Sequence, residues 1–169
     1  TRQFNDKHNC LTLITNLIEQ YQLPPKSLQL EITESLILED SHFILETLSE
    51  LKKLGVLFSV DDFGTGYSSL SYLRRFPVDI LKIDQSFIRD LNLDSGDDAL
   101  IKAIISMGQS LNLQIVAEGV ETQEQLSFLQ THSCDYIQGF YFSKPVPAAK
   151  IAELIQQKNI LSYEGVPHQ

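Results

Sequence analysis

Two adjacent carboxylates are the feature of this sequence with the clearest chemical potential. Asp61 and Asp62 close the apolar run 56–60, and a turn bracketed by Gly64 and Gly66 follows at once. An apolar run of this length between turn residues predicts a buried strand. The carboxylates would then lie at its C-terminal end, where α/β proteins place their chemistry. Burying two like charges unpaired is costly, and a divalent cation removes that cost. A metal site is therefore the first hypothesis, and a solvated acidic turn is the alternative.

Four further predicted strands carry a polar side chain at or near their C-terminal ends: Glu31, Lys82, Glu118 and Gln138. Oxygen donors of this kind suit Mg²⁺ or Mn²⁺ rather than zinc. A two-metal phosphodiesterase uses one ion to activate water and the other to stabilise the leaving oxygen. In such a site Lys82 would hold the attacking water or offset developing negative charge. The alternative for Lys82 is a simple ion pair with Asp84.

The elements that must position these residues are strands alternating with amphipathic helices. Strands are expected at 28–32, 56–60, 80–83, 114–117 and 136–137. Helices are expected at Leu11–Tyr21, after an N-cap at Ser41, at Ser69–Phe76, from Asp97 through Leu111, after a capping box of Thr122 with Gln125, and around Ile151–Ile155.

Alternation of this kind with apolar strands predicts a parallel sheet. A doubly wound sheet would gather its site at one switch point, whereas a barrel collects residues from many strands into one mouth. The polar residues fall at several strand ends, which favours the barrel. Within 28–32, Glu31 and Gln29 share the face opposite to the apolar side chains, as a barrel interior requires. The predicted fold is α/β, a (β/α)₈ TIM-like barrel.

Composition limits the function classes. With 169 residues, 43% of them hydrophobic, the chain can bury one core, and we expect a single domain. A formal net charge of -9 argues against a nucleic-acid polymer or an anionic membrane surface as partner. It leaves open a small anionic ligand bound through metal ions. Cys10 and Cys134 are too few for a disulfide scaffold or a zinc site. Since no long apolar span is visible, we expect a cytoplasmic protein.

Five ordered segments resemble the EAL-domain family: Leu30-Glu31-Ile32-Thr33-Glu34-Ser35, Asp61-Asp62-Phe63-Gly64-Thr65-Gly66-Tyr67-Ser68-Ser69-Leu70, Leu81-Lys82-Ile83-Asp84, Val116-Ala117-Glu118-Gly119-Val120-Glu121-Thr122 and Gln138-Gly139-Phe140. The resemblance implies cyclic di-GMP phosphodiesterases on a modified (β/α)₈ barrel, which open the cyclic dinucleotide to linear pGpG with Mg²⁺ or Mn²⁺. It also implies a homodimer formed through this domain, and sensory or cyclase domains upstream of it.

The same resemblance assigns expected roles to individual residues. The implied metal ligands are Glu31, Asp61, Asp62 and Glu118. Lys82 is implied to contact the catalytic water, and Glu121 and Gln138 to support the network of metal and water. Glu34 is implied to brace the loop that begins with Phe63, Gly64, Thr65 and Gly66 and that couples partner association to activity.

The sequence departs from the family pattern at its N-terminus. The Glu-Ala-Leu motif is missing, and Asp98-Ala99-Leu100 is no substitute because it opens a helix. The family's metal-binding Asn would also fall before Thr1. Since a full barrel takes about 250 residues, we expect residues 1–161 to form a partial EAL domain without its N-terminal βα units. Residues 162–169 would be a tail. Such a truncated form is expected to be inactive or weakly active alone.

Other functions remain open at this stage. A non-catalytic cyclic di-GMP receptor or regulatory module would carry an incomplete metal site as its natural condition. A Schiff-base aldolase would use Lys82 as its nucleophile. A dinucleotide-binding fold is disfavoured, because Ser69 occupies the third glycine position after Gly64-x-Gly66 and Pro77 cuts the following helix short.

Overall fold

The computed structural model describes residues 7–34, 36, 42–64, 73–91 and 95–156. Its elements, in chain order, are α1 (Lys7–Tyr21), β1 (Gln29–Thr33), α3 (His42–Lys53), β2 (Leu57–Phe63), β3 (Ile80–Ile83), α5 (Gln85–Arg89), α6 (Ser95–Ser110), β4 (Gln114–Ala117), α7 (Gln123–Thr131), β5 (Tyr136–Ile137) and α8 (Ala148–Gln156).

The strands form one five-stranded sheet in the order β1-β2-β3-β4-β5, and every neighbouring pair is parallel. The predicted parallel α/β architecture is confirmed. Spatial order follows chain order without the reversal that marks a doubly wound sheet, so successive strand C-termini lie side by side along one edge. This edge positions the candidate site.

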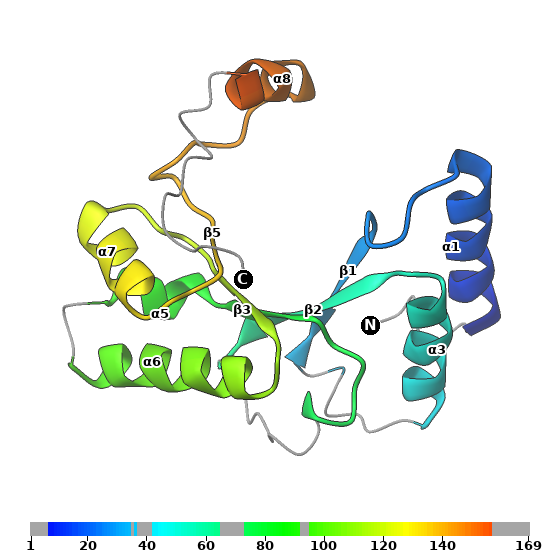
Figure 1. Cartoon of the computed structure of the whole chain (residues 1–169), viewed down its shortest axis with the longest axis horizontal. Coiled ribbons are helices and arrows are strands. Elements are labelled where there is room, and N and C mark those ends of the chain that lie inside the picture. Colours follow the sequence, from blue (N-terminus) through cyan, green and yellow to red (C-terminus); the bar gives the residue numbers. More distant parts are fainter. Residues whose placement is uncertain (1–6, 35, 37–41, 65–72, 92–94, 157–169) are drawn as a thin grey trace.

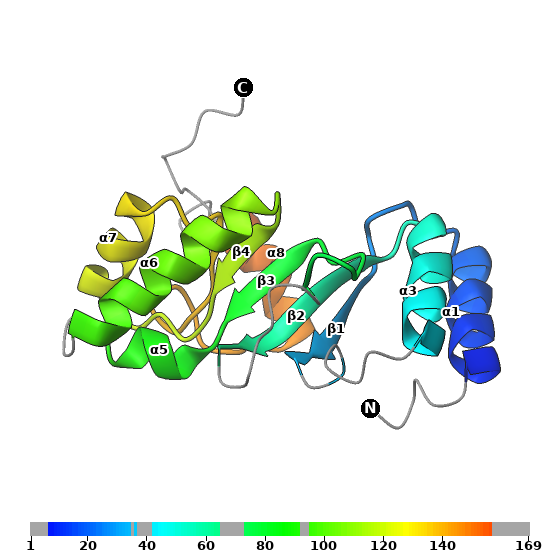
Figure 2. The same ribbon diagram turned by 90° about the horizontal axis from the view of Figure 1, so that it is seen from below.

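The helices form separate groups around the twisted sheet (Figures 1 and 2). Helices α1 and α3 lie side by side near β1, and α5, α6 and α7 gather near β3 and β4. Helix α8 stands apart and has no buried side chain. None of the helices that the structure describes is both long and apolar enough to cross a membrane.

The core is built from the apolar strand runs that the sequence predicts. Phe58, Leu81, Ile83 and Ile115 on the three central strands are fully buried, and so are Leu48 and Leu51 from α3 and Ile101 from α6. Removing a side chain of this size from water contributes about 1.5–3 kcal/mol. The strands that carry the polar site residues are therefore held by one continuous core.

Aspartates fasten the N-terminal ends of the strands. Asp79, just before β3, accepts the backbone N–H of Phe58 at 2.9 Å and also pairs with Lys52. Asp135, just before β5, accepts the N–H of Ile115 at 2.8 Å in the same way. Because these contacts lie at the end of the sheet opposite to the candidate site, they concern stability rather than chemistry.

The structure refines the expected elements in three places. Strand β2 continues through Asp61 and Asp62 to Phe63, instead of ending at residue 60. Helix α5 was not anticipated, because a single turn gives no apolar period; Asp84 caps it. The capping box of Thr122 with Gln125 is confirmed. The Ser41 cap, the first half of the helix predicted at 69–76, and the 162–169 tail lie outside the described residues. Of the second half of that helix, Leu73 is helical and residues 74–76 form a turn and a bend.

Candidate active site

A β-bulge sets the geometry of the two adjacent aspartates. Val60 pairs with Leu81 and Phe63 pairs with Ile83, so Asp61 and Asp62 together stand opposite the single residue Lys82. Asp62 has a φ of 53°, a left-handed conformation that favours Asn, Asp and Gly. A bulge breaks the alternation that sends neighbouring side chains to opposite faces, and it often re-aims a side chain beside an active site.

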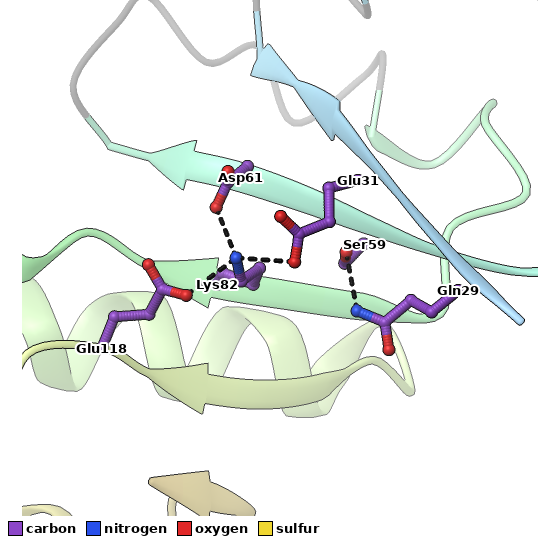
Figure 3. A network of polar contacts seen from close by, with 6 residues as sticks. All are labelled: Gln29, Glu31, Ser59, Asp61, Lys82 and Glu118. Atoms are coloured by element: carbon purple, nitrogen blue, oxygen red, sulfur yellow. Dashed lines mark hydrogen bonds and ion pairs between the residues drawn. The ribbon is translucent and has the colours of Figure 1, made fainter. Parts of the chain in front are cut away.

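Three carboxylates converge on the ammonium group of Lys82 (Figure 3). Its Nζ lies 2.8 Å from Glu31 Oε1, 2.7 Å from Asp61 Oδ1 and 2.7 Å from Glu118 Oε1. Because all three oxygens contact the same nitrogen atom, they lie close to one another. The acids come from β1, from β2 and from the residue that follows β4, so parts of the chain far apart in sequence meet at one point.

The face of the sheet that carries Glu31 and Asp61 is also polar two residues earlier in β1 and β2. Gln29 Nε2 donates to Ser59 Oγ at 2.9 Å, and Gln29 and Glu31 extend from the same side of β1 (Figure 3). Because side chains alternate along a strand, this is the arrangement that the period of 28–32 predicts. Ser59 is fully buried.

Solvent reaches the acids but not the lysine. Lys82 is buried, whereas the side chains of Glu31, Asp61 and Glu118 are 51%, 27% and 20% exposed. Burial alone lowers the pKa of Lys82, but hydrogen bonds to Asp61, Glu118 and Glu31 raise it more, and the net pKa lies well above its ordinary value. Lys82 is thus a permanent cation within a partly open ring of carboxylates. The alternative interpretation of the sequence was a simple ion pair between Lys82 and Asp84. The structure instead pairs Lys82 with Glu31, Asp61 and Glu118.

Asp62 faces a different neighbour. Desolvation and the nearby carboxylates of Asp61 and Asp84 raise the pKa of Asp62, and its side chain is hydrogen-bonded to that of Asp84. Burial raises the pKa of Asp84, but hydrogen bonds from Ser86 outweigh this, and its pKa is lowered. Sequence reasoning missed the role of Asp84 as cap and neighbour of Asp62, although Asp is one of the residues preferred at a helix N-cap.

Glu34 lies beneath the start of the loop that follows β2. It is buried, and its Oε2 accepts the backbone N–H of Gly64 at 3.3 Å. Its Oε1 is buried without a hydrogen-bond partner among the described atoms. The contact with Gly64 is compatible with the predicted brace, while Thr65 and Gly66 lie outside the described residues. The bracing role stays a prediction.

Backbone contacts fix the segment that carries Glu118 and Glu121. Val120 N–H donates to Gln138 O at 3.1 Å, and Tyr141 N–H donates to Val120 O at 2.9 Å. Gly139 lies so close that a Cβ there would stand 2.0 Å from Val120 O. The exposed side chains of Glu121 and Gln138 make no hydrogen bond or ion pair with the Lys82 cluster within the described residues. Their predicted roles are untested by this geometry.

The side chains at this site are chemically suited to bind a hard divalent cation, because such ions prefer carboxylate oxygens as ligands. In the part of the chain that the structure describes, no three acidic, histidine or cysteine side chains are arranged around an open ion position. Lys82 Nζ occupies the point between Glu31, Asp61 and Glu118 instead. An ion at that same point would therefore have to displace the ammonium group.

Known proteins with similar sequences point to one family. A family model described as EAL domain matches residues 1–145. The signaling protein YkoW of Bacillus subtilis is 45% identical over 154 residues, which cover 91% of this chain and 19% of that protein. The cyclic di-GMP phosphodiesterase NbdA of Pseudomonas aeruginosa is 46% identical over 143 residues, 85% of this chain and 18% of that protein. The chain thus spans about a fifth of the length of these relatives.

Solved structures agree with that match. The MucR phosphodiesterase, solved in complex with c-di-GMP, is 45% identical, and its superposition covers 88% of this chain and 60% of that chain with a TM-score of 0.83. The EAL domain of Mycobacterium smegmatis DcpA is 40% identical, with 88% and 66% covered and a TM-score of 0.81. These domains have a TIM-barrel-like fold, and the five-stranded parallel α/β sheet of this chain superposes on part of it.

Proposed function

This chain belongs to the EAL family, and we propose that its function is the metal-dependent hydrolysis of cyclic di-GMP to linear pGpG. The observation that carries the proposal is the convergence of Glu31, Asp61 and Glu118 from separate strands on buried Lys82. Such a gathering of charge at strand C-termini is where barrel enzymes place catalysis. Relatives named as cyclic di-GMP phosphodiesterases support the substrate assignment.

EAL phosphodiesterases depend in general on divalent metal ions. We propose Mg²⁺ or Mn²⁺ for this protein, held by Glu31, Asp61, Asp62 and Glu118, whose oxygens are of the type that both ions prefer. Two such ions supply an activated water and stabilise the oxygen that leaves phosphorus. The exposed carboxylates and the adjacent aspartates of the bulge give this chain the donors for that role.

Lys82 contributes a fixed positive charge to the proposed reaction. Hydrolysis adds one water to the cyclic dinucleotide and breaks one phosphodiester bond, and negative charge builds on the phosphoryl oxygens in the transition state. A buried ammonium held beside this position stabilises the developing charge without reorganising at the moment of reaction. We propose that Lys82 orients the attacking water, and that Glu121 and Gln138 complete the polar surroundings.

One observation favours a second candidate, a non-catalytic cyclic di-GMP receptor. Glu31, Asp61 and Glu118 are all engaged by Lys82, and no open ion position is formed among the described residues. Parallel assays separate the two functions. Hydrolysis of cyclic di-GMP that is abolished by EDTA supports the enzyme, whereas binding of the dinucleotide with no pGpG formed at saturating Mn²⁺ supports the receptor.

Partners beyond the dinucleotide are also proposals. Relatives include a bifunctional diguanylate cyclase/cyclic di-GMP phosphodiesterase, of which this chain matches 20%. We propose that the protein works with further signalling domains of that kind and as a homodimer. Light scattering of the purified protein over a range of concentrations tests the dimer, and a constant monomer mass would exclude it.

A further inference from the structure

Gln125, in the first turn of α7, connects the segment that carries Glu118 and Glu121 to helix α5. Its Oε1 accepts the backbone N–H of Glu121 at 2.8 Å and that of Thr122 at 3.0 Å. Its Nε2 donates to the carbonyl of Ile88, at the end of α5, at 2.9 Å. Gln125 itself is buried. One side chain therefore satisfies three backbone groups that belong to two separate parts of the chain.

Helix α5 is itself tied to the other half of the site. Its N-cap is Asp84, two residues after Lys82, and Asp84 is hydrogen-bonded to Asp62. The start of α5 also touches the acidic segment, since a Cβ on Gly119 would stand 2.6 Å from Gln85 Cβ. Gly119 has a φ of +73° and directly follows Glu118. A shift between α5 and the 118–122 segment would thus change how Glu118 and Glu121 lie relative to Lys82.

The chemistry of the contact requires an amide rather than an acid. A capping box works with Glu as well as Gln, because only the acceptor oxygen is needed. The contact with Ile88 O needs a donor, which an ionised Glu lacks. A carboxylate here would place an oxygen against a buried carbonyl that also accepts the backbone N–H groups of Asp90 and Leu91, and this repulsion between acceptors is costly.

We propose that Gln125 is a positioning residue, which holds the segment Glu118–Thr122 against α5 and thereby fixes Glu118 and Glu121 in the site. Its consequence for turnover rests on the proposed function. A misplacement of about 1 Å in an active site can cost about 10²-fold in rate, so a residue that touches no reacting atom can still control kcat.

The test compares Gln125→Met, Gln125→Glu and a control, Leu129→Ala. Met keeps the length of the side chain but loses both polar contacts, while Glu keeps the acceptor and loses the donor. Leu129 is fully buried on the same helix and its side chain makes no hydrogen bond, so its truncation reports plain destabilisation of α7. Amide hydrogen exchange of Glu121 and Thr122 is measured by NMR, and kcat and KM are measured below the unfolding transition of each variant.

For Gln125→Met we expect exchange at Glu121 and Thr122 to quicken at least about 10-fold more than in Leu129→Ala. We also expect kcat to fall at least about 10-fold with KM little changed. Gln125→Glu should keep the protection of both amides and still lose kcat. Equal exchange in Gln125→Met and Leu129→Ala would overturn the proposal, and so would equal kcat. If the wild-type protein shows no turnover, the proposed function fails, and the exchange data alone decide whether Gln125 holds this segment.

Discussion

Asp61 Oδ1 lies 2.7 Å from Lys82 Nζ, across the bulge where two residues of β2 face one residue of β3. The bulge places a carboxylate over a lysine that the core surrounds, and Glu31 and Glu118 complete the ring from neighbouring segments. The result is a group of negative charges balanced by one fixed cation. This balance is the basis of the first prediction.

Replacing Lys82 with Met should destabilise the metal-free protein by about 1–3 kcal/mol, because three carboxylates lose their shared partner. Added Mg²⁺ or Mn²⁺ should then raise the midpoint of thermal unfolding more in the variant than in wild type, since the ion no longer competes with an ammonium group. Thermal unfolding in EDTA and in metal measures both effects. The control is Lys53→Met, which removes an exposed pair with Glu50. Identical behaviour of Lys82→Met and wild type in both buffers would contradict the assigned balance.

Gly139→Ala should lower both stability and activity. A Cβ at this position would meet backbone atoms of Val120 at 2.0–2.6 Å, and backbone cannot move without displacing the segment that carries Glu118. Gly108→Ala is the matched control, because its Cβ would meet the tip of the Ile115 side chain at 2.1 Å, and that tip can rotate. We expect Gly139→Ala to cost at least about 2 kcal/mol more in unfolding free energy than Gly108→Ala. Chemical denaturation measures the difference, and equal costs would contradict the close packing of Gly139 against the backbone of Val120.

Some features of the fold and the site could be predicted from the sequence, and particular residues show why. The alternation in 28–32 placed Gln29 and Glu31 on one face correctly, because one buried face fixes the pattern of a strand. The spacing of Thr122 and Gln125 gave the capping box, because caps are local. The bulge at Asp61 and Asp62 was not predictable, since it depends on pairing with β3.

Contacts between distant segments account for the other omissions. The bond of Gln125 to Ile88 joins residues 37 positions apart, and nothing near either residue signals it. The link of Asp62 to Asp84 likewise arises only when β2 and β3 lie side by side. Convergence of acids at strand ends follows from the parallel sheet, but which acids meet Lys82 depends on side-chain packing.

Asp79→Ala should destabilise the fold more than Asp135→Ala. Both substitutions remove the acceptor of a strand N–H, for Phe58 and Ile115 respectively, which costs about 1–3 kcal/mol when the donor stays buried. Asp79 also loses its pair with Lys52. Urea denaturation of the two variants measures the order. A smaller loss for Asp79→Ala would show that the Lys52 pair contributes nothing to stability.

The buried thiol of Cys134 predicts a pH dependence of stability. Burial raises the pKa of Cys134 to about 12 from an ordinary value of 9.0. Between these values the unfolded chain holds fewer protons than the folded one, so the unfolding free energy falls as the pH rises, by up to about 1.4 kcal/mol per pH unit. Denaturation curves between pH 8 and 11 in wild type and Cys134→Ala measure the effect. The variant should lose less stability over this range, and parallel losses would contradict the burial of the thiol.

The central claim is that Asp61 belongs to a metal-dependent phosphodiesterase site. The most direct measurement is the turnover of cyclic di-GMP to pGpG by wild type and Asp61→Asn in Mn²⁺, with Glu50→Gln on the outer face of α3 as control. A substitution that keeps the shape but removes the charge should lower kcat by more than about 10³-fold, because both activation of water and stabilisation of the leaving oxygen depend on it. Glu50→Gln should match wild type. Turnover by Asp61→Asn within about threefold of wild type, less than about 1 kcal/mol in the barrier, would contradict the assignment.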